Sequence, residues 1–177
     1  MKNVSLYDNL FGEIDAPMEK LESEASNSKM SVASIKYETK IPNLEKMCYL
    51  MESVVLQKKR EGIIYAGFQK LSRAEAIWDR YLKMAENVDE IYIFGEKDKT
   101  LAPHPKIKII PLTPGHPLIR EWFLVMDIKF GKNMMTAFDL DGFGTYENEK
   151  DRNFRGGKTI NKDIVEKAVL LLEEGMK

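Results

Sequence analysis

The sequence predicts an α/β fold, a single domain with a mixed central sheet of about five to seven strands and helices packed on it. Two continuous apolar runs, residues 63–68 and 91–94, are typical of strands buried on both faces of a sheet. Between them, apolar residues recur at helical spacing. Further apolar runs follow one another in the second half of the chain without an intervening helix. We therefore expect those strands to be joined directly and the sheet to be mixed.

The composition fits this fold class and excludes several functions. The chain has 177 residues, enough for one domain with a sizeable core. Its 27 basic and 28 acidic side chains give a net charge of −1, which predicts no nucleic-acid partner and no membrane partner. The amino-terminal residues contain no apolar run long enough for a signal peptide or a membrane span, so we expect a cytoplasmic protein. The single cysteine, Cys48, excludes a disulfide framework within the chain.

The amino-terminal part predicts a helix followed by a connector. Residues 4–14 carry apolar side chains at helical spacing. Residues 19–29 are rich in Ser, Glu and Lys, which is typical of a mobile connector. We therefore divide the chain into residues 1–29, an N-terminal helix and polar connector, and residues 30–177, the α/β domain.

A strand and a long helix are expected next. Residues 30–38 fit a strand with Val32 and Tyr37 turned inward, or a helical turn, and we favour the strand. The helix opens at Pro42-Asn43, with Asn43 as its cap. Its inward face is predicted to consist of Leu44, Met47, Cys48, Met51, Val54 and Val55.

The first buried strand is followed by another helix and two more strands. Ser72-Arg73-Ala74-Glu75 has the sequence of a capping box, in which the Ser and Glu side chains satisfy free backbone N–H groups at a helix start. This helix extends through Tyr81. After the strand at 91–94, a strand over 107–112 is expected near a sheet edge, because Pro111 cannot donate a hydrogen bond. The inward stripe of the helix is Ala74, Ile77, Trp78, Tyr81 and Ala85.

The second half predicts a hairpin, a last strand and a last helix. Strands over 122–126 and 133–140 are separated by a short loop and form a hairpin. The last strand is expected over 154–160. Asn161 caps the final helix, which ends at Gly175. Its inward residues are Ile164, Val165, Ala168, Leu171 and Leu172.

Polar residues follow the two buried strands at their carboxyl ends, where open α/β sheets bind ligands. Gly67 permits close backbone approach, Gln69 offers a donor and an acceptor, and Arg73 lies in the first turn of a helix, whose free N–H groups favour an anion. Glu96 and Asp98 follow the second strand. We expect these five residues to bind a small effector. The alternative is structural, in which Gly67 relieves crowding, Gln69 satisfies a buried backbone group and Arg73 is solvated.

A second candidate site lies near the carboxyl terminus. Residues 152–159 end like a phosphate-binding loop, but Arg152 stands where that loop needs its first glycine. Arg152 and Arg155 are candidate anion contacts. The alternative is that Gly156-Gly157 forms a turn, with both arginines solvated or paired with acidic neighbours.

No metal site and no catalytic residues are predicted, and the cofactor is unknown. Residues 139–144 resemble part of a calcium loop, but Phe143 and Lys150 occupy positions that need oxygen ligands. A strand end followed by a turn explains that segment better. His104 and His116 lie beside prolines and lack a third ligand, so we interpret them as rigid loop residues.

Several short motifs point to a known family. They are Gly67 to Arg73, Arg80-Tyr81, Ile93-Phe94-Gly95, Trp122-Phe123-Leu124-Val125, and Arg152-x-Phe154-x-Gly156 with Thr159 before a helix. Together they resemble the DICT sensory domain, named for diguanylate cyclases and two-component systems, from about residue 5 to the carboxyl terminus. The resemblance implies a non-catalytic input module of signal transduction, whose partner is a small-molecule effector or a signalling protein.

Three functional hypotheses follow. The first is a sensory or ligand-binding module; because such domains usually adjoin an output domain, we expect a standalone sensor or a piece of a longer system. The second is an interaction or oligomerisation module, in which residues 4–14 dock on a partner or on a second copy to form a homodimer. The third is a small phosphate-binding enzyme that works through Arg152, Arg155 and Lys158.

Overall fold

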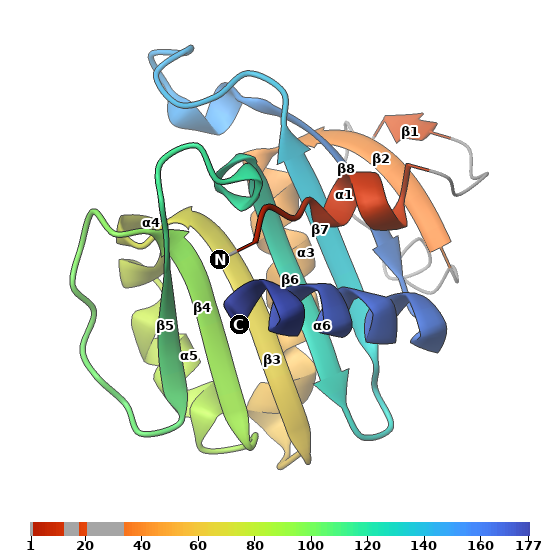
Figure 1. The fold of residues 1–177 in the computed structure, drawn as a ribbon, viewed down its shortest axis with the longest axis vertical. Coiled ribbons are helices and arrows are strands. Elements are labelled where there is room, and N and C mark those ends of the chain that lie inside the picture. The colour runs from red at the N-terminus through yellow and green to blue at the C-terminus, as the bar shows by residue number, and fades with distance from the viewer. Residues whose placement is uncertain (1, 13–17, 21–33) are drawn as a thin grey trace.

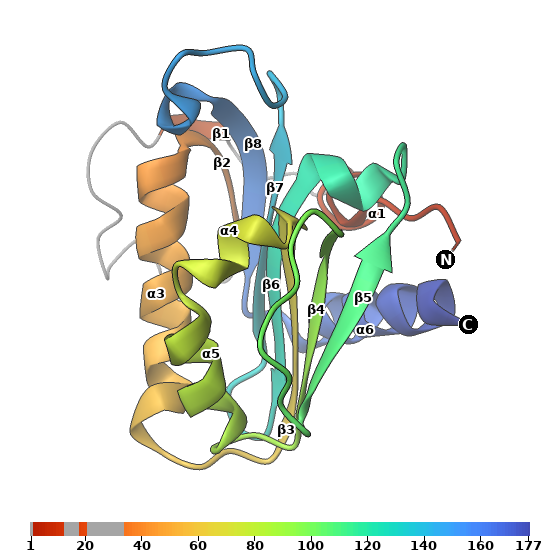
Figure 2. The same cartoon turned by 90° about the vertical axis from the view of Figure 1, so that its left-hand side faces the viewer.

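The computed structural model describes residues 2–12, 18–20 and 34–177, which form one sheet with helices on both faces (Figure 1). The strands are β1 (Met18–Lys20), β2 (Ser34–Lys40), β3 (Gly62–Lys70), β4 (Glu90–Glu96), β5 (Ile107–Leu112), β6 (Glu121–Ile128), β7 (Asn133–Asp139) and β8 (Asn153–Thr159). The helices are α1 (Leu6–Leu10), α3 (Ile41–Gln57), α4 (Ser72–Glu75), α5 (Trp78–Ala85) and α6 (Lys162–Met176), with 3-10 turns η1 (Pro117–Arg120) and η2 (Glu149–Asp151). Figure 2 shows α3, α4 and α5 on one face, and α1 and α6 on the other.

The predicted fold class is confirmed. The strand order is β1-β2-β8-β7-β6-β3-β4-β5, and the sheet is mixed. The neighbours β3, β4 and β5 are parallel, whereas β2, β8, β7, β6 and β3 pair antiparallel in turn. The hairpin of β6 and β7 is therefore confirmed, and so is the edge position of β5.

Hydrophobic residues fill both faces of the sheet, as the continuous apolar runs predicted. Successive residues of a strand point to opposite faces. Ile64, Ala66 and Phe68 of β3 pack with α3 and α5, whereas Ile63 and Tyr65 pack on the face covered by α1 and α6. The central parallel strands β3 and β4 are therefore buried on both sides, and their carboxyl ends lie side by side.

Helix α3 starts earlier than predicted, and its predicted cap is wrong. The N-cap position is Lys40, and Pro42 occupies the first turn, where its missing N–H costs no hydrogen bond. The side chain of Asn43 instead donates to Thr39 Oγ1 at 3.0 Å. Val54 is 38% exposed rather than inward. The other predicted inward residues are buried: Leu44, Met47, Cys48, Met51 and Val55.

The single capped helix expected from Ser72 is divided into α4 and α5, and the capping box does not form. The carboxylate of Asp98 accepts hydrogen bonds from the Ser72 N–H at 2.9 Å and from its hydroxyl at 2.5 Å. Glu75 forms an ion pair with Lys99 at 2.8 Å instead of returning to the helix start. The cap of α4 is therefore supplied by the segment that follows β4, a contact that no local sequence pattern contains.

Gly156 and Gly157 lie in β8, which confirms the strand expected over 154–160 and shows that the alternative of a turn at these glycines is wrong. A Cβ on Gly156 would lie 2.5 Å from the carbonyl oxygen of Thr136 and would meet the ring of Tyr37. A Cβ on Gly157 would meet the ring of Phe11. Glycine is needed at both positions because large side chains lie directly over this strand on each face.

The last helix begins as predicted. Asn161 Oδ1 accepts from the N–H groups of Asp163 at 2.9 Å and Ile164 at 3.4 Å. The helix continues through Gly175 to Met176, so Gly175 does not end it. None of the helices in the described part of the chain is long and apolar enough to cross a membrane.

The amino-terminal helix packs on this chain's own sheet. Four apolar side chains of the segment are buried there: Val4, Leu6, Leu10 and Phe11. They therefore do not form a free face for a partner. Glu19 and Lys20 belong to β1 rather than to a connector, whereas Ile14, residues 21–29, Val32 and the division at 29/30 lie outside the described residues.

Candidate functional site

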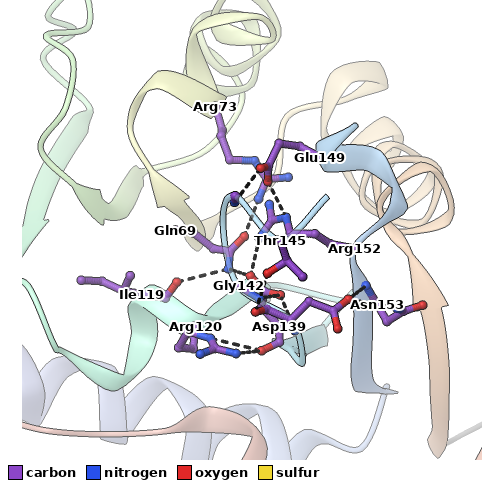
Figure 3. Close-up of polar contacts among 12 residues, drawn as sticks. Gln69, Arg73, Ile119, Arg120, Asp139, Gly142, Thr145, Glu149, Arg152 and Asn153 are labelled. Carbon is purple, nitrogen blue, oxygen red and sulfur yellow. Dashed lines mark hydrogen bonds and ion pairs between the residues drawn. The ribbon is translucent and has the colours of Figure 1, made fainter. Parts of the chain in front are cut away.

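The carboxyl end of β3 carries a buried polar network (Figure 3). The pairing of β3 with β4 shifts register between Gly67 and Lys70, and Gln69 has a φ of 65°, which is uncommon for a residue other than glycine. The Gln69 side chain is fully buried, and its Nε2 donates to Asp139 Oδ2 at 3.1 Å and to the Ile119 carbonyl at 3.2 Å. One amide thus joins β3, β7 and η1.

Asp139, at the end of β7, is the centre of this network. Its carboxylate forms a close ion pair with the fully buried Arg152, and its Oδ1 accepts from the Gly142 N–H at 2.8 Å. Arg120 Nε donates to the Asp139 carbonyl at 3.1 Å. Arg152 Nε also lies 2.8 Å from Glu149 Oε2. These contacts anchor both ends of the loop between β7 and β8, residues 140–152.

Arg73 connects the network to the helical face. Its Nη1 donates to Gln69 Oε1 at 2.5 Å, and its guanidinium lies 4.4 Å from the ring centroid of Trp122 and 6.0 Å from that of Phe143. Burial, reinforced by the positive charge of Arg152, lowers the pKa of Arg73 to about 10. Arg73 therefore remains charged at neutral pH although much of its hydration is lost.

A pocket of about 440 Å³ lies between α3, α4, α5 and the sheet, and Arg73 is on its wall. Its uncharged lining is mainly apolar and aromatic. These residues are Cys48, Tyr49, Phe68, Ala76, Ile77 and Trp122. A cavity with an apolar lining and a few converging polar groups is typical of a small-molecule site.

A second arginine in the pocket already has a counter-ion. Arg80 Nε lies 2.8 Å from Glu52 Oε2, and the Tyr81 hydroxyl donates to Glu52 Oε1 at 2.8 Å. Burial raises the pKa of Glu52 to about 7, although Arg80 and Tyr81 oppose the rise. Burial and the charge of Glu52 also raise the pKa of the Cys48 thiol well above its usual value. Cys48 is therefore a small apolar residue here, as predicted.

Two predicted ligand residues lie at the network, and a third lies beside it. Arg73 lines the pocket, and Gln69 binds Arg73 directly. A Cβ on Gly67 would meet the ring of Phe123, so Gly67 makes room for that ring. The assignment of these residues to a ligand stays a prediction.

The two predicted residues after β4 make contacts within the fold. The backbone carbonyl of Glu96 accepts from the Leu71 N–H at 3.0 Å. The carboxylate of Asp98 is bound by Ser72, as described above. Both residues hold the start of α4, and neither lines the pocket that Arg73 borders.

The structure separates the predicted anion contacts near the carboxyl terminus. Arg152 is buried in the ion pair with Asp139, whereas Arg155 is exposed and pairs with Glu38 at 2.8 Å. Arg155 and Lys158 lie an odd number of residues apart in β8, so they point to opposite faces of the sheet. The residues of the third hypothesis therefore do not converge on one phosphate.

The other segments considered for metal binding have structural roles. Asp139 ends β7 and a turn follows, as predicted in place of a calcium loop. His104 and His116 hold loops, because Nδ1 of each accepts at 3.2 Å from the N–H two residues further on. Within the described ranges, no three His, Cys, Asp or Glu side chains come together as a metal site.

Sequence reasoning missed the pocket and most of its charged lining. Glu52 carried a signal, because it stands between Met51 and Val55 on the inward face of α3, where a carboxylate needs a partner. Arg80 and Trp122 carried no comparable signal. Their meeting with Arg73 depends on the packing of α3 and α5 against β6, which is not a local property.

Comparison with solved structures shows the fold. The chain is similar to a polyphosphate kinase from Porphyromonas gingivalis, with a TM-score of 0.50 and 13% identity over 97% of this chain. The chain spans only 26% of that kinase, so the likeness concerns the fold alone. It is also similar to the yeast tyrosyl-DNA phosphodiesterase, with a TM-score of 0.33 and 12% identity over 61% of this chain and 28% of that one.

Comparison with protein families gives a more specific result. No curated protein matches the chain. One family model matches residues 19–137, and its description is a sensory domain in diguanylate cyclases and two-component systems. The matched range begins later and ends earlier than the resemblance predicted, but it spans β1 to β7 and well over half of the chain. The chain therefore belongs to the DICT family of sensory domains.

Proposed function

We propose that this chain is a non-catalytic sensory module that binds a small organic anion in the pocket between α3 and α4–α5. The observation that carries the proposal is that Arg73 lies on the pocket wall and forms no ion pair within the described part of the chain. A guanidinium with free N–H groups is a preferred partner for a carboxylate. The description of the family as sensory supports a binding role.

The shape and lining of the pocket favour an acid with an apolar body. Its volume of about 440 Å³ suits a small molecule. Phe68, Ile77 and Trp122 offer apolar surface, and the charge of Arg80 is already compensated by Glu52. A bound carboxylate would compensate the charge of Arg73 and would replace the hydration that burial removes.

Within this proposal, Arg73 contacts the ligand and Gln69 positions Arg73. A ligand that draws Arg73 toward the pocket weakens its bond to Gln69 Oε1. Because the same amide donates to Asp139, the change reaches the ion pair with Arg152 and the loop 140–152. That loop is the region where we expect a signalling protein to detect the bound state.

Binding of defined acids tests the proposal. Benzoate, hexanoate and the neutral amide benzamide are added to the purified full chain, and the melting temperature and the heat of binding are measured. The acids should raise the melting temperature of the wild type, whereas benzamide should not. Arg73→Gln should abolish the effect of the acids, because it removes the charge that the carboxylate requires.

Lys83→Gln is the matched control, because Lys83 is an exposed cation on the adjacent helix and does not line the pocket. It should respond to acids like the wild type. Equal stabilisation of Arg73→Gln and the wild type would overturn the assignment of Arg73. Failure of both acids to bind the wild type would overturn the organic-anion site itself.

A further inference from the structure

A second pocket is lined by residues at the amino ends of β3 and β4 and at the turn of the β6–β7 hairpin. These ends of the strands lie at the bottom of Figure 1. Its volume is about 470 Å³. Three segments besides the hairpin contribute to it: the residues after α3, the residues between α5 and β4, and the residue before β5. Its cationic lining residues are Lys58, Lys59, Arg60, Lys106 and Lys129.

The acidic residues of this pocket are already engaged, so its cations are in excess. Glu61 pairs with Lys129 at 2.8 Å, and Asp89 accepts from the backbone N–H of Gly62 at 2.7 Å. Glu86 lies 3.5 Å from His104. The exposed side chains of Lys58 and Lys59 have no carboxylate partner among the residues that the structure describes.

Arg60 gives this pocket a fixed and unsatisfied donor. Its backbone N–H donates to the Asn87 carbonyl at 2.7 Å, and the Asn87 amide donates to the Val55 carbonyl at 2.9 Å. The backbone at Arg60 is therefore anchored to α3 and to the turn after α5. Its side-chain Nε is buried and has no hydrogen-bond partner in the described chain. A buried N–H without an acceptor is costly, and an anionic oxygen would satisfy it.

Phe130 forms the other wall. Its side chain is 91% exposed at the tip of the hairpin, and its φ is 61°. The left-handed backbone is unfavourable for an aromatic residue, and full exposure of the ring gains no burial. The ring centroid lies 5.8 Å from Lys129 Nζ, and the ring lines the same pocket as Lys58 and Lys59, so it offers a surface for stacking beside cations.

We propose that this pocket binds a nucleotide, with its phosphates on Lys58, Lys59 and Arg60 and its base stacked on Phe130. The phosphate oxygens would accept from the guanidinium of Arg60 and would neutralise the two unpaired lysines. The base would cover the exposed ring. This site is independent of Arg73, since the two pockets share no lining residue.

An anionic membrane surface is the main competing occupant, because it also attracts lysines and an exposed aromatic ring. The pocket favours the small ligand. Its cations line a cavity of about 470 Å³, which a small molecule can enter, whereas a flat layer of headgroups does not fill it.

Calorimetry with ATP, adenosine and tripolyphosphate tests the proposal on the full chain. ATP should bind and adenosine should not, because the phosphates supply the charge. Arg60→Gln should weaken ATP binding by about tenfold or more. The double variant Lys58→Gln/Lys59→Gln changes only exposed side chains and should weaken it similarly. Phe130→Asn, which tolerates the left-handed backbone, should weaken ATP several-fold and leave tripolyphosphate unchanged.

Two control variants should bind ATP like the wild type. They are Lys97→Gln, which changes an exposed lysine after the carboxyl end of β4, and Arg73→Gln. The nucleotide assignment is overturned if ATP does not bind at about millimolar concentration. The nucleotide assignment is also overturned if ATP and tripolyphosphate bind with equal affinity and Phe130→Asn changes neither affinity. A membrane would be the occupant instead if the wild type does not bind ATP but sediments with phosphatidylserine vesicles, and if the lysine double variant no longer sediments with them.

Discussion

Gln69 and Arg73 are joined by a hydrogen bond of 2.5 Å from Arg73 Nη1 to Gln69 Oε1, four residues apart across the turn from β3 into α4. The Gln69 amide also donates to Asp139 and to the Ile119 carbonyl. One side chain therefore links the pocket wall to the buried ion pair that holds the loop 140–152. The left-handed backbone at Gln69 is the local cost of that connection.

Replacing Gln69 by Met should lower the free energy of unfolding by about 2–3 kcal/mol. Met has a similar length and the same backbone preference, so the change isolates the amide. It leaves the Ile119 carbonyl without a donor and Arg73 without its acceptor, and it removes one of the two side-chain donors to Asp139 Oδ2, the other being Arg152 Nη1. Urea denaturation measures the loss. Gln57→Met, at an exposed position at the end of α3, is the control and should change stability little; equal losses in both variants would contradict the role of the Gln69 amide.

Replacing Arg152 by Met should cost about 3–5 kcal/mol, because it leaves the Asp139 carboxylate buried without its counter-ion. The double variant Arg152→Met/Asp139→Asn should lose less than the sum of the single losses, since the second change removes the uncompensated charge. Arg155→Met breaks an exposed ion pair with Glu38 and should cost below about 1 kcal/mol. Additive losses in the double variant would show that the two residues act independently.

The sequence predicted the layers of the fold because each layer has a local signature. The apolar runs of β3 and β4, the edge proline of β5 and the Asn161 cap depend on residues that are close in the chain. The capping box at Ser72 failed because Asp98, 26 residues away, supplies a stronger acceptor. The Gly156-Gly157 turn failed because the residues that require glycine there belong to β2, to β7 and to the position directly after α1.

The candidate site was predicted only in part. Gln69 and Arg73 were found because they follow a buried strand, which is a local property. Their partners Asp139, Arg152 and Trp122 come from three other strands or strand ends. In the sequence, Asp139 belonged to a segment like a calcium loop, Arg152 to one like a phosphate loop and Trp122 to a strand. The pocket itself depends on how two helices pack on the sheet, which periodicity does not specify.

Glu121 should make stability depend on pH. Its buried carboxyl accepts from Ser5 Oγ, the Leu6 N–H and Thr136 Oγ1 at 2.5, 3.0 and 3.1 Å, which ties α1 to the sheet. Burial raises its pKa to about 7 despite these hydrogen bonds. A folded pKa above the unfolded value means that the folded state binds the proton more tightly. The contribution to stability is therefore complete below about pH 4.5 and is lost as the pH rises through about 7.

The size of this effect is up to about 3 kcal/mol for Glu121, and Glu52 contributes in the same direction. Glu121→Gln should be less pH-dependent than the wild type when urea midpoints at about pH 5 and about pH 8 are compared. Its amide can still accept from Leu6 and donate to the Ser5 hydroxyl. Glu147→Gln, at an exposed position, should keep the wild-type dependence. An unchanged slope in Glu121→Gln would argue against a raised pKa at this residue.

Variants of Gly67 distinguish a role of this residue in packing from a role in ligand binding. Gly67→Ala places a Cβ against the ring of Phe123 and should cost about 1–3 kcal/mol by urea denaturation. Gly131→Ala is the control, because its Cβ would lie 3.2 Å from the flexible end of Ile128, and it should be tolerated better.

The double variant Gly67→Ala/Phe123→Leu should recover part of the loss by removing the ring that causes the collision. In that variant the heat of benzoate binding distinguishes the two roles of Gly67. Binding at wild-type affinity means that Gly67 serves only the packing of β3 against Phe123. Loss of binding in a variant of restored stability means that the ligand approaches the backbone at Gly67, as its position at the end of a buried strand predicts.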